Sequence, residues 1–394
     1  MASVSSKTAN NAVAFVNGRV CTMDVKKPWA PAFVVSPTGD FATVGSDDEI
    51  RAIVRRDKLV VYDLRQHFVM PGIHDAHTHL LVASMQKLNE CDIGFGSNGE
   101  TLAGNLHRAS CACAYTNFPD GVPDSKYLDD RYPDQPVLVR ETSCHNVLFN
   151  TASLKRCGID ERETQDPPGG YYKRRADGSL TGEIVEGATR DVWLSLPQAP
   201  LAYVKRTLEY GIEMCHRFGI TSCQEASANT VYLHALKELE GENRLHLSVY
   251  PHIVCAPEGP ALESEDSLRA VLDIAATFDS KHVRARFVNF FLDGAPLPPD
   301  FTQCDLDADG NPDSKFLLLD DDKLFDSLQK YDARGMTCKV HVAGEGSVRR
   351  ALDIFQTLRN KHPNGPWHEL AHCTGSGRLR GRTDGDSRAR CGVS

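Results

Sequence analysis

The sequence predicts an α/β protein in which a small β-rich lobe precedes a larger parallel sheet covered by helices. Residues 12–67 consist of short apolar runs separated by turn signals, whereas from residue 68 onward apolar strands alternate with segments of helical periodicity. Repeated strand–helix units form parallel sheets, because each helix returns the chain to the start of the next strand. The pattern alone leaves open whether that sheet is closed or open.

Tight turns between short strands are expected throughout the N-terminal lobe. A strand over residues 13–16 leads into Asn17-Gly18, which is a strong signal for a two-residue turn. The other expected elements of the lobe are strands over 19–23, 33–35, 41–45 and 59–64 and a short helix over 49–54.

Six strands are expected in the larger region, residues 68–374. The first is an apolar run over 68–73 that ends in polar residues, as a buried parallel strand does at its functional end. The six strands are expected to end within 68–79, 219–225, 246–254, 286–293, 336–341 and 369–372. Residues 85–200 are rich in Asp, Pro, Gly and Asn, so we expect a large insertion there, with one clear strand over 137–139.

Composition and charge restrict the possible partners and compartment. The formal net charge of −9 argues against nucleic acid or an anionic membrane as a partner, because both attract basic surfaces. The sequence has neither a secretory signal pattern at its N-terminus nor an apolar run of about 18 residues. Thirteen cysteines, an odd number, favour reduced thiols in the cytoplasm over a disulfide framework, and Cys111 and Cys113 are interpreted as ordinary thiols rather than a metal pair.

His77 and His79 are the first candidate metal ligands. They are two residues apart, so on a strand both imidazoles face the same side. The apolar run before them places them at the carboxyl end of a parallel strand, which is the functional end of such sheets. Two imidazoles converging there suit Zn²⁺, with Asp75 nearby to orient them or to bind the ion.

Two further histidines end later strands. His341 follows an apolar strand and precedes a glycine turn, and His372 ends the last expected strand. The segment from His368 to His372 also fits the H-E-x-x-H pattern, in which two histidines on a helix bind zinc and Glu369 is the general base. From these residues alone, a helical zinc protease and a strand-borne ligand are both open.

The chain resembles the amidohydrolase superfamily, specifically its amidohydrolase 3 (YtcJ-like) branch, over roughly residues 12–373. The motifs that carry the resemblance are, in chain order, the Asn17-Gly18 turn, Pro71 to His79, Asp166 to Gly170 with Thr181-Gly182, Gly219 to Ser222, Phe291 to Gly294, His341 to Glu345 and the strand that ends at His372. The resemblance implies a (β/α)8 TIM-like barrel after an N-terminal β-sandwich half, and it favours a strand over the protease helix at Glu369.

The resemblance also implies the chemistry of the site. His77, His79, His341 and His372 would hold one or two divalent ions, with zinc expected, and the metal would activate water to attack a polarised carbonyl or amidine carbon. His145 is expected to face the substrate, and Glu186 is a further candidate for substrate binding.

Two departures from the family pattern stand out. Many relatives carry a metal-bridging carbamylated lysine where this chain has Asn289, so either one metal is bound, which we favour, or Glu186 bridges two. Only six barrel strands are expected, and the aspartate that acts as general base at the end of the eighth strand has no counterpart, so the catalytic residues remain unknown.

Residues 375–394 are rich in Arg, Gly, Asp and Ser, and we expect a truncated or altered, disordered end there.

These observations predict a metal-dependent hydrolase of C–N bonds in linear or cyclic non-peptide amides, acting on a small molecule. Two alternatives remain at this point: a catalytically impaired or non-enzymatic relative, and a deaminase of ring amidines that uses the same ligands. Whether the chain forms a homo-oligomer is open.

Overall fold

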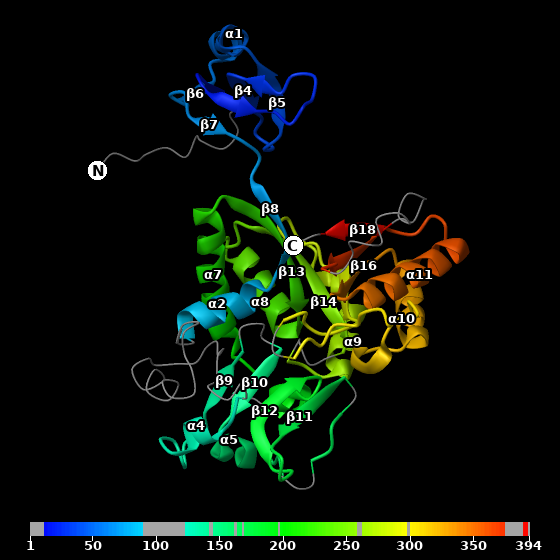
Figure 1. The fold of residues 1–394 in the computed structure, drawn as a ribbon. Coiled ribbons are helices and arrows are strands. Elements are labelled where there is room, and N and C mark those ends of the chain that lie inside the picture. Colours follow the sequence, from blue (N-terminus) through cyan, green and yellow to red (C-terminus); the bar gives the residue numbers. More distant parts are fainter. Residues whose placement is uncertain are drawn as a thin grey trace. The chain divides into compact units, whose positions relative to one another are not determined.

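The computed structural model describes residues 12–89, 123–141, 145–160, 164–167, 169–195, 198–257, 262–297, 300–374 and 389–392. The chain divides into two compact units, Met1–Ile73 and His74–Ser394 (Figure 1). The lobe expected over residues 12–67 lies within the first unit.

The N-terminal unit contains two small sheets and one helix. Its elements are β1 (Val13–Val16), β2 (Arg19–Cys21), β3 (Trp29–Ala30), β4 (Ala32–Val35), β5 (Phe41–Gly45), α1 (Asp47–Asp57), β6 (Val60–Asp63) and β7 (Phe68–Val69). The sheets have the strand orders β5-β4-β1-β6 and β3-β2-β7. Helix α1 begins with a capping box, in which the side chains of Ser46 and Glu49 each accept a hydrogen bond from the other residue's backbone N–H. Ile50 buries the inner face of this helix against β1 and β4.

The turn at Asn17-Gly18 does not join two paired strands. Asn17 has a φ of +56°, as a tight turn requires, but β1 pairs with β4 and β6 while β2 pairs with β3 and β7. A Cβ on Gly18 would lie 2.4 Å from Cδ1 of Leu64, so the glycine also permits a close approach. The Asn-Gly pair correctly predicted a tight turn. The strands on its two sides, β1 and β2, belong to different sheets and do not pair with each other.

The larger unit is built on a seven-stranded parallel sheet. Its strands are β8 (Ile73–Thr78), β13 (Ile220–Ala228), β14 (Ser248–Ala256), β15 (Phe287–Phe291), β16 (Thr337–Val342), β17 (His368–His372) and β18 (Ala389–Gly392). They lie in the order β18-β17-β16-β15-β14-β13-β8. The six strands from β8 to β17 form a nearly closed barrel, which confirms the expected incomplete TIM-like fold.

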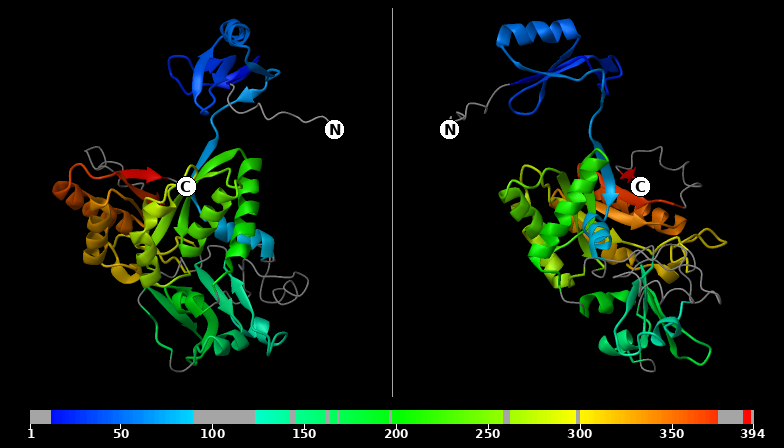
Figure 2. Two further views of the ribbon diagram at one scale, coloured as in Figure 1. Left: turned by 180° about the vertical axis from the view of Figure 1, so that it is seen from behind. Right: turned by 90° about the vertical axis from the view of Figure 1, so that its left-hand side faces the viewer.

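Helices follow the strands along the outside of the curved sheet (Figure 2). They are α2 (Leu80–Asn89), α7 (Leu201–Arg217), α8 (Thr230–Gly241), α9 (Glu265–Asp273), α10 (Asp321–Ala333) and α11 (Glu345–Lys361), with the 3-10 turns η2 (Ala275–Phe278) and η3 (Ser314–Phe316). Leu236, Leu328 and Phe355 are among the helix residues buried against the strands in one continuous hydrophobic core. This core fixes the strands whose carboxyl ends carry the candidate ligands.

Two expectations about the sheet need correction. The apolar run over 68–73 is not one strand, because β7 joins β2 in the lobe and the barrel strand β8 begins only at Ile73; Pro71-Gly72 lies between them, and proline cannot continue a ladder. Residues 389–392 were expected to be disordered, but they form β18, paired in parallel with β17. The exposed edge of β17 supplies backbone hydrogen bonds that composition does not reveal. Residues 375–388 and 393–394 lie outside the described residues.

The expected insertion contains a second, antiparallel sheet. Its elements are α4 (Lys126–Asp129), β9 (Leu138–Arg140), β10 (Asn146–Phe149), α5 (Thr151–Arg156), β11 (Gly170–Arg174), β12 (Leu180–Glu186) and α6 (Thr189–Ser195). The strand order is β11-β12-β10-β9. Asn146 of β10 pairs with Val185 of β12, which brings the residue before β10 beside the residue that ends β12. These two residues are His145 and Glu186.

Candidate metal centre

The four predicted ligand histidines lie at the carboxyl ends of three barrel strands. His77 and His79 lie at the end of β8, His341 lies in β16, and His372 is the last residue of β17. Strands β8 and β17 are at opposite ends of the six-stranded order, yet the ring centroids of His77 and His372 are 4.7 Å apart. The sheet therefore curls until its two sides meet at the candidate site.

The four rings form one continuous cluster. The centroid of His372 is 4.5 Å from that of His341, and those of His77 and His79 are 5.4 Å apart. His372 reaches the cluster through a backbone φ of +74°, which is uncommon for a residue with a side chain. Backbone strain of this kind concentrates at functional sites, where the surrounding structure holds it in place.

Burial keeps most of these imidazoles neutral. It is the largest cause of a shift that lowers the pKa of His77 to about 2, with further lowering from the other histidines and from Lys339. The pKa values of His79 and His372 fall for the same first reason, to about 4 and about 3. Neutral imidazole is the form that binds metal ions.

His77 carries a further indication of an absent ligand. Both of its ring nitrogens are buried without a hydrogen-bond partner, which is costly unless a metal or another group fills the space. In the part of the chain that the structure describes, no three His, Cys, Asp or Glu side chains are already arranged to hold an ion. The unpartnered nitrogens of His77 and the three imidazoles gathered with it are donors that suit a divalent metal, once the rings turn toward a common point.

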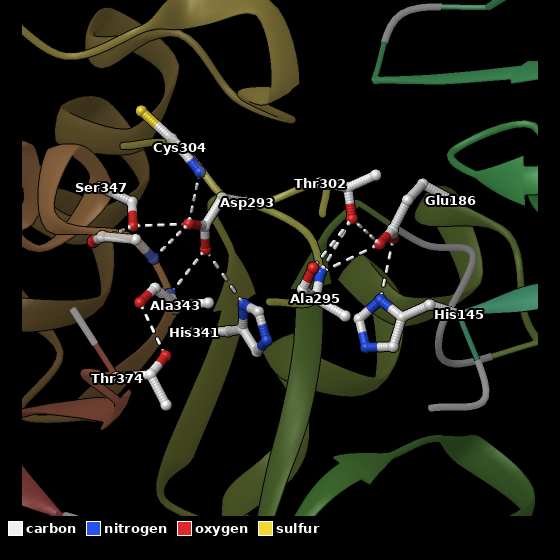
Figure 3. Close-up of polar contacts among 11 residues, drawn as sticks. His145, Glu186, Asp293, Ala295, Thr302, Cys304, His341, Ala343, Ser347 and Thr374 are labelled. Atoms are coloured by element: carbon white, nitrogen blue, oxygen red, sulfur yellow. Dashed lines mark hydrogen bonds and ion pairs between the residues drawn. The ribbon is translucent and has the colours of Figure 1, made fainter. Parts of the chain in front are cut away.

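Asp293 orients His341. Oδ1 of Asp293, just beyond the end of β15, lies 3.4 Å from Nδ1 of His341 (Figure 3). Its carboxylate also accepts hydrogen bonds from the backbone N–H groups of Cys304 at 3.0 Å and of Ala343 and Gly344 at 2.9 Å, and from the Ser347 hydroxyl at 2.6 Å. Burial opposes ionisation of Asp293, but His341 and these donors outweigh it and lower its pKa. A carboxylate fixed in this way is a typical partner for a metal-binding histidine.

His79 is held by strand β13. Its Nδ1 lies 2.8 Å from the hydroxyl of Ser227. The neighbouring Glu225 accepts hydrogen bonds from the backbone of Ser227 at 3.0 Å and of Leu81 at 3.3 Å. Burial raises the pKa of Glu225 to about 7. These contacts join the start of α2, directly after the histidine pair, to the adjacent strand.

His145 and Glu186 meet as an ion pair beside the cluster. Nδ1 of His145 is 2.8 Å from Oε2 of Glu186, and the centroids of His145 and His341 are 6.0 Å apart. The other carboxylate oxygen of Glu186 accepts from Ala295 N at 3.0 Å and from the Thr302 hydroxyl (Figure 3). Burial lowers the pKa of His145, but Glu186 outweighs it and raises the value overall. The same contacts overcome the effect of burial on Glu186 and lower its pKa to about 2.

Asn289 and Glu186, the two residues considered for a metal bridge, both make hydrogen bonds to other groups in this structure. Asn289 is fully buried in β15, and its side-chain nitrogen donates to Ala226 O at 2.7 Å. Both carboxylate oxygens of Glu186 are occupied by hydrogen-bond donors. Asp384 and Asp386, the acidic residues nearest the chain end, lie outside the described residues, so no structural role is assigned to them.

The strand around His372 excludes the helical zinc-protease alternative. His368 begins β17 and His372 ends it, and in an extended strand residues four apart cannot bind one ion. His368 instead contacts the backbone N–H of Cys338 at 3.1 Å and the guanidinium of Arg359 at 2.7 Å.

Three side chains around the site were not singled out from the sequence: Ser227, Glu225 and Lys339. The first two follow the Gly219 to Ser222 motif with no spacing rule that would mark them. Lys339 could have been predicted from the sequence, because it lies two residues before His341 in an apolar strand and so faces the same side of the sheet as that histidine.

The amidohydrolase family profile matches residues 60–389, which is most of the chain. The chain belongs to the amidohydrolase family. Its likeness to a putative amidohydrolase, YtcJ of Bacillus subtilis, agrees with the amidohydrolase 3 branch that the motifs predicted; the two are 26% identical over 255 residues, 62% of this chain and 45% of that protein.

A second relative is an N-substituted formamide deformylase of Arthrobacter pascens. It is 28% identical over 214 residues, which are 51% of this chain and 38% of that protein. The chain thus spans less than half the length of these two curated relatives.

Two solved structures share the fold. They are described as uncharacterized metal-dependent hydrolases from Pyrococcus horikoshii and Pyrococcus furiosus, each 20% identical to this chain, with TM-scores of 0.68 and 0.66. Both cover 92% of this chain, which covers 70% and 72% of them.

Cysteines and helices in the described residues add two observations. Eight cysteines of the described residues, from Cys21 to Cys373, are free, and Cys111 and Cys113 lie outside this part of the chain. No helix among the described residues combines the length and the apolar character that crossing a membrane requires.

Proposed function

We propose that this chain is a hydrolase that uses a bound divalent metal to cleave C–N bonds in linear or cyclic amides other than peptide bonds. The observation that carries the proposal is the cluster of His77, His79, His341 and His372, in which both ring nitrogens of His77 are buried without a partner. Family membership supports hydrolysis as the reaction class.

The four histidines would hold the ion, and zinc is the metal we propose, since neutral imidazole is a preferred ligand of Zn²⁺. When bound, the metal would supply Lewis-acid activation of water and of the substrate carbonyl. We propose one ion rather than two, because Asn289 cannot form a carbamate and the carboxylate of Glu186 is already occupied.

We propose that His145 and Glu186 bind the substrate. Glu186 fixes the imidazole and raises its pKa, which favours the protonated form. In that form His145 would attract the oxygen of an amide carbonyl and stabilise the negative charge that develops on it during attack. Asp293 would keep His341 in position during the same step.

The substrate class rests on likeness and on the donor set. One relative is named an N-substituted formamide deformylase, and a small non-peptide amide fits the same chemistry. The free cysteines of the described residues fit a cytoplasmic protein.

The experiment is a hydrolysis assay on the zinc-loaded chain. N-substituted formamides, other linear amides and cyclic amides would be supplied, and the released amine or ring-opened acid measured. We expect activity that is lost in His77→Ala and retained in His216→Ala, whose histidine lies on the exposed side of α7. Equal activity in His77→Ala, or no amide cleavage by the zinc-loaded chain, would refute the proposal.

The same assay separates the two alternatives. Ammonia released from ring amidines without amide cleavage would identify a deaminase. Zinc binding with turnover about 10²–10⁴-fold slower than in related hydrolases would identify a catalytically impaired relative.

A further inference from the structure

A charged cluster fills the barrel interior one step nearer the start of the strands than the histidines. Lys339 lies two residues before His341 on β16, and it is 3% exposed. Glu369 is its register partner on β17, and their charged atoms are 3.1 Å apart. Both side chains therefore point into the barrel, beneath the candidate metal centre.

The ammonium of Lys339 has an acceptor for each of its three protons. Nζ donates to Ala76 O at 2.8 Å, to the carboxylate of Glu369, and to the side-chain oxygen of Gln224. An ammonium group has three N–H donors and no acceptor, so this set satisfies it completely. Its burial is then tolerated, because its charge is neutralised and its hydrogen bonds are made.

These contacts connect strands that are not neighbours in the sheet. Strand β16 lies between β15 and β17, whereas Ala76 belongs to β8 and Gln224 to β13 at the other end of the order. Gln224 also donates to Glu369 at 3.4 Å, and Nε2 of His252 on β14 lies 3.5 Å from the same carboxylate. The cluster therefore spans the interior and ties one end of the sheet to the other.

The strands joined in this way are the ones that carry the histidines. Ala76 directly precedes His77, and Glu369 lies on the short strand that ends at His372. The separation of these two rings, 4.7 Å between centroids, depends on how closely β8 approaches β17. In the strand order of the described residues, β8 and β17 are not hydrogen-bonded neighbours, and they are connected through β13, β14, β15 and β16.

We propose that Lys339 is a positioning residue, which holds β8 against β16 and β17 so that the histidines of opposite strands can share one ion. The inference rests on the proposed metal site but concerns the geometry that the chain itself provides. A buried ion pair is weak support for stability by itself, since apolar side chains of similar size often replace it without loss. Its value here is the fixed distance between two ligand-bearing strands.

The experiment compares Lys339→Met with wild type in two measurements. Zinc alone is titrated calorimetrically into the metal-free protein, and amide hydrogen exchange is followed in the metal-free protein at residues 73–78. We expect zinc affinity about 10- to 100-fold weaker, as for loss of a group that orients ligands, and faster exchange in that segment. Lys339→Met/Glu369→Gln removes both charges and is the form to use if the single variant does not fold.

Arg359→Met is the matched control. Arg359 is another buried cation, paired with Asp332, but it lies on α11 and contacts none of the four histidines. It should lose stability without changing zinc affinity or exchange at residues 73–78. The inference would be overturned if amide exchange at residues 73–78 were unchanged in the Lys339 variants. It would also be overturned if their zinc affinity fell no further than that of Arg359→Met. If wild type binds no zinc, the proposed function fails, and the exchange measurement alone decides the role of Lys339.

Discussion

Replacing Glu186 by glutamine removes the charge that holds His145 while keeping the shape of the side chain. The carboxylate is 8% exposed, and its contacts lower its pKa from 4.5 to about 2. A difference of that size between unfolded and folded states corresponds to ~3 kcal/mol of folding free energy at neutral pH. The glutamine oxygen can still accept from Ala295 N and the Thr302 hydroxyl while its NH2 group faces Nδ1 of His145, so the variant tests the loss of the negative charge.

Urea unfolding in a buffer that chelates metal measures the loss directly. Because the folded pKa is depressed, the contribution of Glu186 is fully present above pH 4.5 and is lost as pH falls toward 2. We therefore expect Glu186→Gln to lower the free energy of unfolding by ~3 kcal/mol at pH 7, with a gap that narrows as pH falls below 4.5.

A matched glutamate gives the control. Glu213 forms an exposed ion pair with Arg217 on α7, so Glu213→Gln should cost only about 0.3–0.5 kcal/mol. If Glu186→Gln loses no more than Glu213→Gln, or if its deficit grows as pH falls, the ion pair does not have the energetic role described above.

Three other predictions concern separate parts of the molecule. Gly344→Ala should lower the melting temperature strongly, because a Cβ there would lie 2.0 Å from Cys304 O, whereas Gly241→Ala meets nothing within 4 Å and should leave it unchanged; calorimetry of both variants checks this. Ser46→Ala removes half of the capping box of α1 and should destabilise the N-terminal unit by about 1 kcal/mol, read from the unfolding of that unit. Chelation of zinc should lower the melting temperature of wild type but not of His77→Ala, because an ion that binds only the folded state stabilises it.

Local patterns in the sequence predicted the elements that local forces determine. Apolar runs indicated most of the barrel strands, and segments of helical periodicity between them indicated helices such as α10. The histidines at 77 and 79 could be assigned to one face from their spacing alone, and the structure gathers them with His341 and His372. Their role as ligands stays a prediction.

Long-range pairing was less accessible from sequence. Nothing near Asn17-Gly18 indicates that the strands on its two sides join different sheets, because that choice depends on partners such as β4 and β6 far along the chain. Side chains alternate along β17, so His372, three residues after Glu369, would be expected on the opposite face of the sheet. Its φ of +74° breaks the alternation and turns the ring toward the barrel interior, where Glu369 also points. The cluster around Lys339 likewise joins residues more than a hundred positions apart.

Anomalous diffraction from zinc-loaded crystals would locate the bound ion and its ligands. We expect a single zinc peak within bonding distance of His77, His79, His341 and His372, with none beside Asn289 or Glu186. A zinc peak bound by other residues, two peaks bridged by Glu186, or no peak at the histidine cluster in crystals grown with excess zinc would contradict it.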